Sequence, residues 1–207
     1  MTDIYLASRS PRRRELLRQI GVRFEPLVLR LAQPRGADID ETPHPGESAA
    51  DFAARVATAK AGFGLQVLGM RHLAVHPVLA ADTVVTVDGE ILGKPADRAE
   101  AAAFLRRLSG RTHEVRTFVA LACGSATRPD LVTAESVSAV RFAALAEGQI
   151  ERYCAGGEPY DKAGGYAIQG MAATFIEHLD GSYSGVMGLP LFETAQLLRR
   201  AGIADLP

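Results

Sequence analysis

An aspartate interrupts an apolar segment near the middle of the chain. Asp82 and Thr83 follow Ala80-Ala81 and precede Val84-Val85, in a run whose other residues are typical of a buried strand. Burying a carboxylate without a partner is energetically costly, so Asp82 requires a cation, a metal ion or a functional cleft beside it. The alternative is that Asp82 ends the strand. The apolar residues on both sides favour the functional explanation.

Lys60 is a second candidate for chemistry. A capping signal, Ser48-x-x-Asp51, predicts the start of a helix whose apolar stripe includes Lys60. A half-buried ammonium usually finds a carboxylate or a phosphate. The alternative is a lysine whose stem lies along the edge of the stripe while its ammonium reaches water.

Lys94 follows the strongest hairpin signal in the chain, Asp88-Gly89. A two-residue turn at this point places the flanking residues opposite each other and, further along, Thr83 opposite Lys94. Asp82 then lies on the other face of the strand. A site shared by all three residues requires strand twist, a bulge at Gly93, or the reach of the lysine.

Three consecutive arginines occupy the first turn of a predicted helix. Arg12, Arg13 and Arg14 stand where the helix dipole already places positive charge, which is unfavourable unless an anion binds there. A phosphate at the helix start, assisted by the hydroxyls of Ser8 and Ser10, explains the arrangement. A solvated basic turn is the alternative explanation.

A glycine-rich segment over 160–170 is a candidate ligand-binding loop. Its glycines permit close approach of the backbone, and Gln169 carries an amide that can both donate to and accept from the edge of a base. This signal is weak without the others. Taken together, the candidate residues indicate a site for a polyphosphate and a metal ion.

Strand and helix signals alternate along the chain and predict an α/β fold with a mixed sheet. Strands are predicted over 4–7, 24–29, 78–87, 90–93, 115–123, 131–142 and 174–179. Helices are predicted over 11–20, 49–63, 97–108, 147–154 and 190–200. A polar, proline-rich loop over 30–46 is long enough to be functional.

Composition excludes several classes of protein. The 207 residues are 47% hydrophobic and 23% charged, which is typical of a globular chain and not of a disordered one. With 23 Lys and Arg against 24 Asp and Glu, no bulk charge favours nucleic acid or an anionic membrane. Two cysteines cannot form a disulfide framework, and no apolar run is long enough to cross a membrane. We expect a cytoplasmic protein.

Seven segments, in order along the chain, resemble the motifs of the Maf family of nucleoside triphosphate pyrophosphatases. They are residues 6–13 (LASRSPRR), 38–42 (DIDET), 81–85 (ADTVV), 93–95 (GKP), 108–113 (LSGRTH), 161–164 (DKAG) and 188–190 (GLP). P-loop, dinucleotide-binding and serine-hydrolase signatures are missing from the sequence. The resemblance covers nearly the whole chain, 1–207, which we interpret as one domain with two lobes.

The resemblance implies a fold similar to that of the inosine triphosphate pyrophosphatases: an elongated mixed sheet flanked by helices, with a cleft between two lobes. It also implies a homodimer. The implied reaction hydrolyses a nucleoside triphosphate between its α and β phosphates, giving a monophosphate and pyrophosphate, with Mg²⁺ or Mn²⁺ as the cofactor.

Matching the family motifs implies roles for individual residues. Asp82 is the expected proton acceptor for the attacking water, or a metal ligand in its place, and Glu41 is expected to help hold the metal. The expected triphosphate-binding residues are Arg12, Arg13, Lys60 and Lys94, with Ser8 and Ser10 at the helix start. The loop around Glu41 is longer than is usual in the family, which leaves Asp38 and Asp40 as other possible ligands.

The segment after Asp161 is similar to that of the subgroup that acts on dTTP and UTP. Arg12, Thr83 and Gln169 correspond to the positions that set base specificity in that subgroup. Four alternatives remain open at the level of sequence: a pyrophosphatase that acts on modified pyrimidine nucleotides, a 7-methyl-GTP pyrophosphatase, a nucleotide-binding regulator of division with incidental hydrolysis, and a nucleotidyltransferase.

Overall fold

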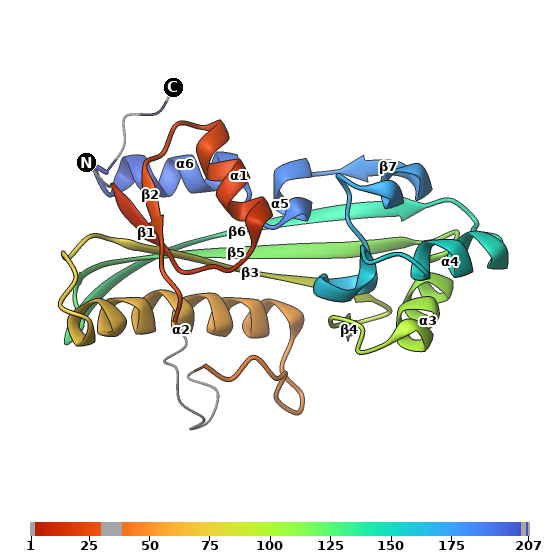
Figure 1. Ribbon diagram of the computed structural model, residues 1–207, viewed down its shortest axis with the longest axis horizontal. Helices are drawn as coiled ribbons and strands as arrows, with labels where there is room; N and C mark the ends of the chain where they lie inside the picture. The colour runs from red at the N-terminus through yellow and green to blue at the C-terminus, as the bar shows by residue number, and fades with distance from the viewer. Residues whose placement is uncertain (1–2, 30–38, 204–205, 207) are drawn as a thin grey trace. The chain divides into compact units, whose positions relative to one another are not determined.

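The computed structural model describes residues 3–29, 39–203 and 206, and its centre is a mixed seven-stranded sheet (Figure 1). The strands are β1 (Ile4–Leu6), β2 (Phe24–Pro26), β3 (Val78–Val87), β4 (Glu90–Leu92), β5 (Thr112–Ser125), β6 (Arg128–Phe142) and β7 (Ile176–Asp180). Their order is β2-β1-β3-β5-β6-β7, and β4 pairs with β3. β1 is parallel to β2 and β3, whereas the β3-β4 and β6-β7 pairs are antiparallel. The predicted α/β class is confirmed.

Helices lie between these strands along the chain and after the last one. The α-helices are α1 (Pro11–Gln19), α2 (Ala49–Met70), α3 (Arg98–Leu108), α4 (Glu147–Cys154), α5 (Tyr183–Met187) and α6 (Leu191–Arg200), and the 3₁₀ helices are η1 (Pro159–Asp161), η2 (Ala163–Gly165) and η3 (Met171–Phe175). Ser10, Ser48 and Asp97 cap α1, α2 and α3, because each side chain accepts the N–H three residues further on. No helix in the described part of the chain is both long and apolar enough to cross a membrane.

The chain divides into two compact units. The first contains the described residues up to Asp82, then 118–135 and the part from Gly188 onward, and the second contains 83–117 and 136–187. β3, β5 and β6 contribute residues to both units.

One buried apolar cluster of the first unit lies between α2 and the sheet. Figure 1 shows α2 on one face of this part of the sheet, and α1 and α6 on the other. Gly64 of α2 packs so closely on β3 that a Cβ atom here would lie 2.5 Å from Val78 Cγ1. Ala57 and Ala61 are also buried in this contact. Small side chains therefore let the helix approach the strand that carries Asp82.

The core of the second unit is aromatic. Phe142 makes edge-to-face contacts with His113, Tyr166 and Phe175, with ring centroids 4.9 to 6.2 Å apart. His113 is buried and its Nε2 lies 2.7 Å from the Tyr166 hydroxyl. Burial lowers the pKa of His113 to about 4, so the ring is neutral at pH 7.

The predicted hairpin register is confirmed near the turn and wrong further away. Asp88 and Gly89 both have positive φ, as a type I′ turn requires, and Val87 pairs with Glu90. The ladder then ends at Leu92, so the predicted pairing of Thr83 with Lys94 does not form among the described residues. The chain leaves the strand there because the Gly93 carbonyl accepts the Gly164 N–H at 3.0 Å instead.

Other predicted boundaries were also wrong. β2 ends at Pro26 and not at residue 29, because its partner β1 ends at Leu6. α2 runs to Met70 and not to residue 63, because apolar residues continue on its buried face. β5 and β6 extend into the predicted turn over 124–130, where pairing satisfies the backbone. The predicted strand over 174–179 begins only at residue 176, after η3, and α5 was not predicted.

Candidate active site

Lys60 forms ion pairs with two carboxylates. Its Nζ donates to Asp82 Oδ1 at 2.9 Å and lies 3.0 Å from Glu41 Oε2. The side chains of Lys60 and Asp82 are only 13% and 14% exposed, so water and salt screen this pair less than a surface pair. Three of the residues that the sequence analysis selected thus meet within the first unit.

The approach of α2 to β3 explains why Lys60 reaches Asp82. Lys60 precedes Gly64 by one helical turn, so both project from the same side of α2. Since Gly64 has no side chain, that side lies directly against β3. Lys60 therefore lies close to the strand, where its partner Asp82 is partly exposed.

Glu41 and Asp40 differ in their contacts. Asp40 Oδ1 accepts the Thr42 N–H at 2.9 Å, and Oδ2 lies 3.2 Å from His44 Nε2. The Thr42 N–H, and then the His44 ring, hold the pKa of Asp40 below its usual value. The Asp40 carboxylate therefore bonds within its own loop, whereas the Glu41 carboxylate forms an ion pair with Lys60. Asp38 lies outside the described residues.

The group formed by Glu41, Lys60 and Asp82 suits a cation that brings its own further ligands. Two carboxylates share one ammonium, which leaves a net negative charge there. Mg²⁺ usually binds through one or two carboxylates, with water and substrate phosphates completing its shell. In the described ranges, no group of three or more His, Cys, Asp or Glu side chains is placed so that it could hold a metal ion. The donor set therefore fits a metal that arrives with a triphosphate better than a metal held by protein alone.

Arg13 joins three segments of the first unit. Its Nε donates to the Gly188 carbonyl at 2.6 Å, and its Nη1 donates to the Ala81 carbonyl at 2.7 Å and to Ser8 Oγ at 3.5 Å. Burial lowers the pKa of the Arg13 guanidinium, and the nearby Asp82 carboxylate opposes that shift. Arg13 thus braces the peptide group next to Asp82, a structural role that the sequence did not reveal.

The start of α1 is basic and contains no acidic side chain in its first turn. Ser10 Oγ accepts the Arg13 N–H at 3.4 Å, and Ser8 Oγ accepts the Ser10 N–H at 3.2 Å. Arg14 turns back to the carbonyls of Ser10 and Arg9, at 3.5 and 3.0 Å. Arg12 is partly buried and also makes contacts within the protein. The two hydroxyls thus form the cap. Because the first turn of α1 contains no acidic side chain, none there neutralises the positive end of the helix dipole.

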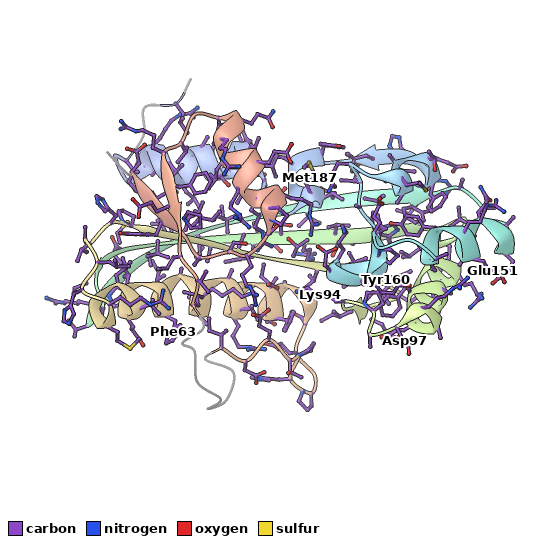
Figure 2. All side chains as sticks on the ribbon, viewed as in Figure 1. Phe63, Lys94, Asp97, Glu151, Tyr160 and Met187 are labelled. Atoms are coloured by element: carbon purple, nitrogen blue, oxygen red, sulfur yellow. The ribbon has the colours of Figure 1, made fainter. Side chains whose placement is uncertain are left out.

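Three of the predicted residues belong to the second unit. Thr83 Oγ1 lies 2.9 Å from Thr117 Oγ1, which in turn lies 2.8 Å from the Gly185 carbonyl. Lys94 follows β4 and is exposed (Figure 2). Gln169 is exposed on the segment between η2 and η3.

Comparison with known proteins places the chain in a family. The family model described as Maf-like protein matches residues 3–201. The chain belongs to the Maf family. A protein of Aromatoleum aromaticum named dTTP/UTP pyrophosphatase is 57% identical over 200 residues, which cover 96% of this chain and 95% of the relative.

Two further relatives carry the same name, dTTP/UTP pyrophosphatase. The protein of Bordetella parapertussis is 55% identical over 97% of this chain and 93% of its own length. The protein of Dechloromonas aromatica is 51% identical over 98% of this chain and 99% of its own length. The similarity therefore extends over nearly the whole length of each chain.

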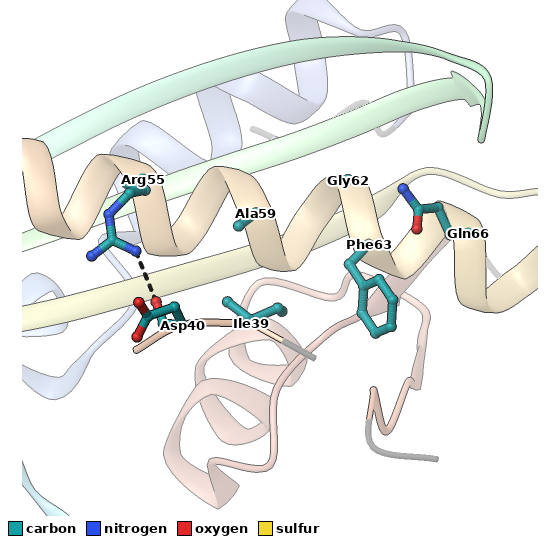
Figure 3. Close-up of a pocket in the computed structure, with 7 residues that line it drawn as sticks. All are labelled: Ile39, Asp40, Arg55, Ala59, Gly62, Phe63 and Gln66. Carbon is teal, nitrogen blue, oxygen red and sulfur yellow. Dashed lines mark hydrogen bonds between the residues drawn. The ribbon is translucent and has the colours of Figure 1, made fainter. Parts of the chain in front are cut away.

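A groove on α2 of this Maf chain lies apart from the Lys60 ion pairs. It has a volume of about 540 Å³, and its lining residues are Ile39, Asp40, Arg55, Ala59, Gly62, Phe63 and Gln66 (Figure 3). Neither Lys60 nor Asp82 lines it. Its two charged side chains are already bonded within the protein, Asp40 to His44 and Arg55 to Glu47. We therefore do not assign the chemistry of the Maf chain to this groove.

Sequence analysis missed two charged residues that hold loops of the Maf chain. Arg55 bonds to the loop that carries Glu41, and Glu158 bonds to the backbone just after Gln169. Their partners are mostly backbone groups, which have the same chemistry at every position in a sequence. The one feature of the sequence that could have drawn attention to Arg55 is its position on the same predicted helix as Lys60.

Proposed function

We propose that this Maf protein hydrolyses dTTP and UTP to the nucleoside monophosphate and pyrophosphate, with Mg²⁺ or Mn²⁺ as the cofactor. The observation that carries the proposal is the sheltered Lys60 ammonium bound to both Asp82 and Glu41, in a chain whose curated relatives are named dTTP/UTP pyrophosphatase. A binding protein would have little use for carboxylates among phosphate-binding cations, because they repel the ligand.

In the proposed reaction, a water oxygen attacks the α phosphorus and the bond from that phosphorus to the bridging oxygen breaks. Pyrophosphate leaves, and the proton of the water passes to Asp82. Lys60 engages Oδ1 of Asp82, and among the described residues no hydrogen bond occupies Oδ2, which can therefore accept that proton. When bound, the metal supplies positive charge to the phosphate oxygens, and Glu41 and Asp82 are the residues that would hold it.

The remaining residues are proposed to bind the substrate. Lys60, Lys94, Arg12 and Arg13 supply positive charge for the triphosphate, and Ser8 and Ser10 hold the start of α1 against it. Gln169 is proposed to read the base, with help from Thr83 and Arg12. Its amide can donate to a carbonyl and accept from the ring N–H of thymine or uracil, and this pattern is shared by both bases.

The assembly and location of the protein are also proposals. We propose that residues 1–207 form one domain, and that the protein acts as a homodimer in the cytoplasm and binds neither nucleic acid nor membrane. Light scattering during size exclusion measures the mass directly. A monomer at assay concentration would contradict the dimer.

Product analysis tests the proposed activity. Purified protein is incubated with dTTP, UTP, CTP, dATP, GTP or 7-methyl-GTP, with Mg²⁺ or Mn²⁺, and pyrophosphate and orthophosphate are measured separately. We expect monophosphate and pyrophosphate from dTTP and UTP first. Asp82→Asn should fold normally, and its turnover should fall by about 10²-fold to 10⁴-fold. Orthophosphate as the product, preference for 7-methyl-GTP, or full activity of Asp82→Asn would each contradict part of the proposal.

A further inference from the structure

Arg55 of α2 binds the loop that carries Glu41. Arg55 Nε donates to Glu47 Oε1 at 2.6 Å, and its Nη2 donates to Glu47 Oε2 at 2.9 Å. The same guanidinium donates to two backbone carbonyls. Its Nη1 donates to the Asp40 carbonyl at 2.8 Å (Figure 3), and its Nη2 donates to the Thr42 carbonyl at 3.0 Å. We call these four hydrogen bonds the Arg55 clasp.

The two carbonyls in the Arg55 clasp belong to the residues on either side of Glu41. The Asp40 carbonyl belongs to the peptide group that precedes Glu41, and the Thr42 carbonyl belongs to the group after Thr42. The clasp therefore holds the backbone on both sides of Glu41 and limits the directions that its side chain can take. The Glu41 side chain is 54% exposed, and its recorded contact in the described part of the chain is with Lys60. Without the clasp, a single exposed ion pair would have to hold this carboxylate, and such pairs contribute little order.

The arginine-carboxylate pair of the clasp is more sheltered than the loop that it holds. The Glu47 side chain is 9% exposed and Arg55 28%, and Arg55 stacks over the Phe52 ring at 5.5 Å. Two-pronged arginine-carboxylate pairs are both stronger and geometrically more restrictive than single contacts. Glu47 Oε2 also accepts the His44 N–H at 3.0 Å, so the far end of the loop is held as well.

Arg55 has little capacity left for a phosphate. A guanidinium has five N–H groups, and four hydrogen bonds of the clasp use most of them. We therefore do not propose Arg55 as a substrate-binding residue, unlike Arg12 and Arg13 of α1.

We infer that Arg55 is a positioning residue that holds Glu41 in place for the metal. The inference rests on the proposed function, in which Glu41 and Asp82 bind a divalent cation with the triphosphate. Arg55 acts through the loop backbone and touches neither metal nor substrate. Groups that orient a metal ligand typically change metal affinity by about 10-fold to 100-fold when they are removed.

Mn²⁺ binding provides the test, because it is measurable without turnover. Free Mn²⁺ is followed by electron paramagnetic resonance, alone and with the α,β-methylene analogue of dTTP, for wild type, Arg55→Met, Arg55→Lys and Glu41→Gln. We expect both Arg55 variants to weaken Mn²⁺ binding by about 10-fold. Lysine should not rescue, because one ammonium cannot form the two-pronged pair and reach two carbonyls. The KM for dTTP at saturating Mn²⁺ should change less than about 3-fold, because substrate-binding groups are intact.

The double variant Arg55→Met, Glu41→Gln decides whether the two residues act together. If Arg55 acts through Glu41, the double variant binds Mn²⁺ no more weakly than Glu41→Gln alone. The inference would be overturned if the Arg55→Met and Glu41→Gln effects on Mn²⁺ binding multiplied in the double variant. Unchanged Mn²⁺ binding in a folded Arg55 variant would also overturn it. Glu47→Gln, which keeps Arg55 but weakens the pair, is the variant to use if Arg55→Met does not fold, and it should shift binding in the same direction.

Arg106→Met is the matched control. Arg106 forms an exposed pair with Glu147 in the second unit, so its loss should leave Mn²⁺ binding unchanged. A shift in this control equal to that of Arg55→Met would also overturn the inference. Failure of the proposed function is distinguishable, because a wild-type protein that binds Mn²⁺ through this coupled pair but leaves dTTP intact would refute only the activity.

Discussion

Two loops of this protein are held by opposite charges. The loop around Glu41 is held by a cation, Arg55, which takes backbone carbonyls. The segment around Gln169 is held by an anion, Glu158, whose carboxylate accepts the N–H groups of Met171 and Ala172 at 3.0 and 3.2 Å.

Burial separates the two loops further. Residues 40–46 are all exposed, whereas Gly164–Ile168 are all buried, and a Cβ on Gly164 would touch Val85 at 3.0 Å. The Tyr153 hydroxyl adds a third bond to Glu158 at 2.8 Å. The first loop therefore depends on a few polar contacts and should open at low free energy, whereas the second is part of its unit's core.

The largest effect expected from this contrast is on stability in the second unit. Glu158→Ala leaves a buried tyrosine hydroxyl and two N–H groups without their acceptor, so we expect a loss of about 3 to 4 kcal/mol in the free energy of unfolding. Urea unfolding measures it. Glu151→Ala, on the exposed face of α4, is the control and should change stability by less than about 0.5 kcal/mol. Equal stability of both variants would contradict the core role of Glu158.

Acid should affect the second unit before it affects the Arg55 clasp. The pKa of His113 is about 4 in the folded protein and about 6.5 when unfolded, so the unfolded state binds the extra proton between these values. Stability due to neutral His113 is present above pH 6.5 and is lost as pH falls toward 4, by about 3 kcal/mol. The free energy of unfolding of His113→Phe should change less between pH 6.5 and 4 than that of the wild type. An equal change in both proteins would contradict this role of His113.

The Arg55 clasp should stay ionised in the same range. The Arg55 side chain, and then the His44 N–H, hold the pKa of Glu47 at about 2. Its contribution is lost only as pH falls below the ordinary glutamate value of about 4.5 toward 2. Titration of the Glu47 carboxyl by NMR checks this order, and a midpoint near 4.5 would contradict it.

A smaller effect is expected at the contact that brings Lys60 to Asp82. In Gly64→Ala, the new Cβ would meet Val78, so we expect α2 to shift and stability to fall by about 1 to 3 kcal/mol. Turnover should fall as well, because Lys60 moves with the helix. Gly69→Ala is the control, since nothing lies within 4 Å of a Cβ there. Similar turnover in both variants would contradict the proposed coupling.

The smallest effect on stability is expected at Gln169, although its loop is the better buried. The side chain itself is exposed, so Gln169→Ala should change the free energy of unfolding by less than about 0.5 kcal/mol. The ratio of kcat/KM values for dTTP and CTP should nevertheless fall. An unchanged ratio would count against base reading by Gln169.

Local features of the fold were predictable from sequence. The cap at Ser48, the turn at Asp88-Gly89 and the span of α4 depend on residues a few positions apart, and the structure confirms them. Boundaries set by a partner were not predictable, as the early end of β2 shows. A strand ends where its neighbour ends, and the neighbour is distant in sequence.

The candidate site divides in the same way. Sequence alone determined that Asp82 and Lys60 are misplaced in apolar surroundings and need charged partners, because burying an unpaired charge is costly in any fold. Only the tertiary structure decided that they are each other's partners, that Glu41 rather than Asp40 joins them, and that Arg55 holds Glu41's loop. Those choices depend on how closely α2 approaches β3 and on backbone carbonyls, and a list of side chains does not contain either.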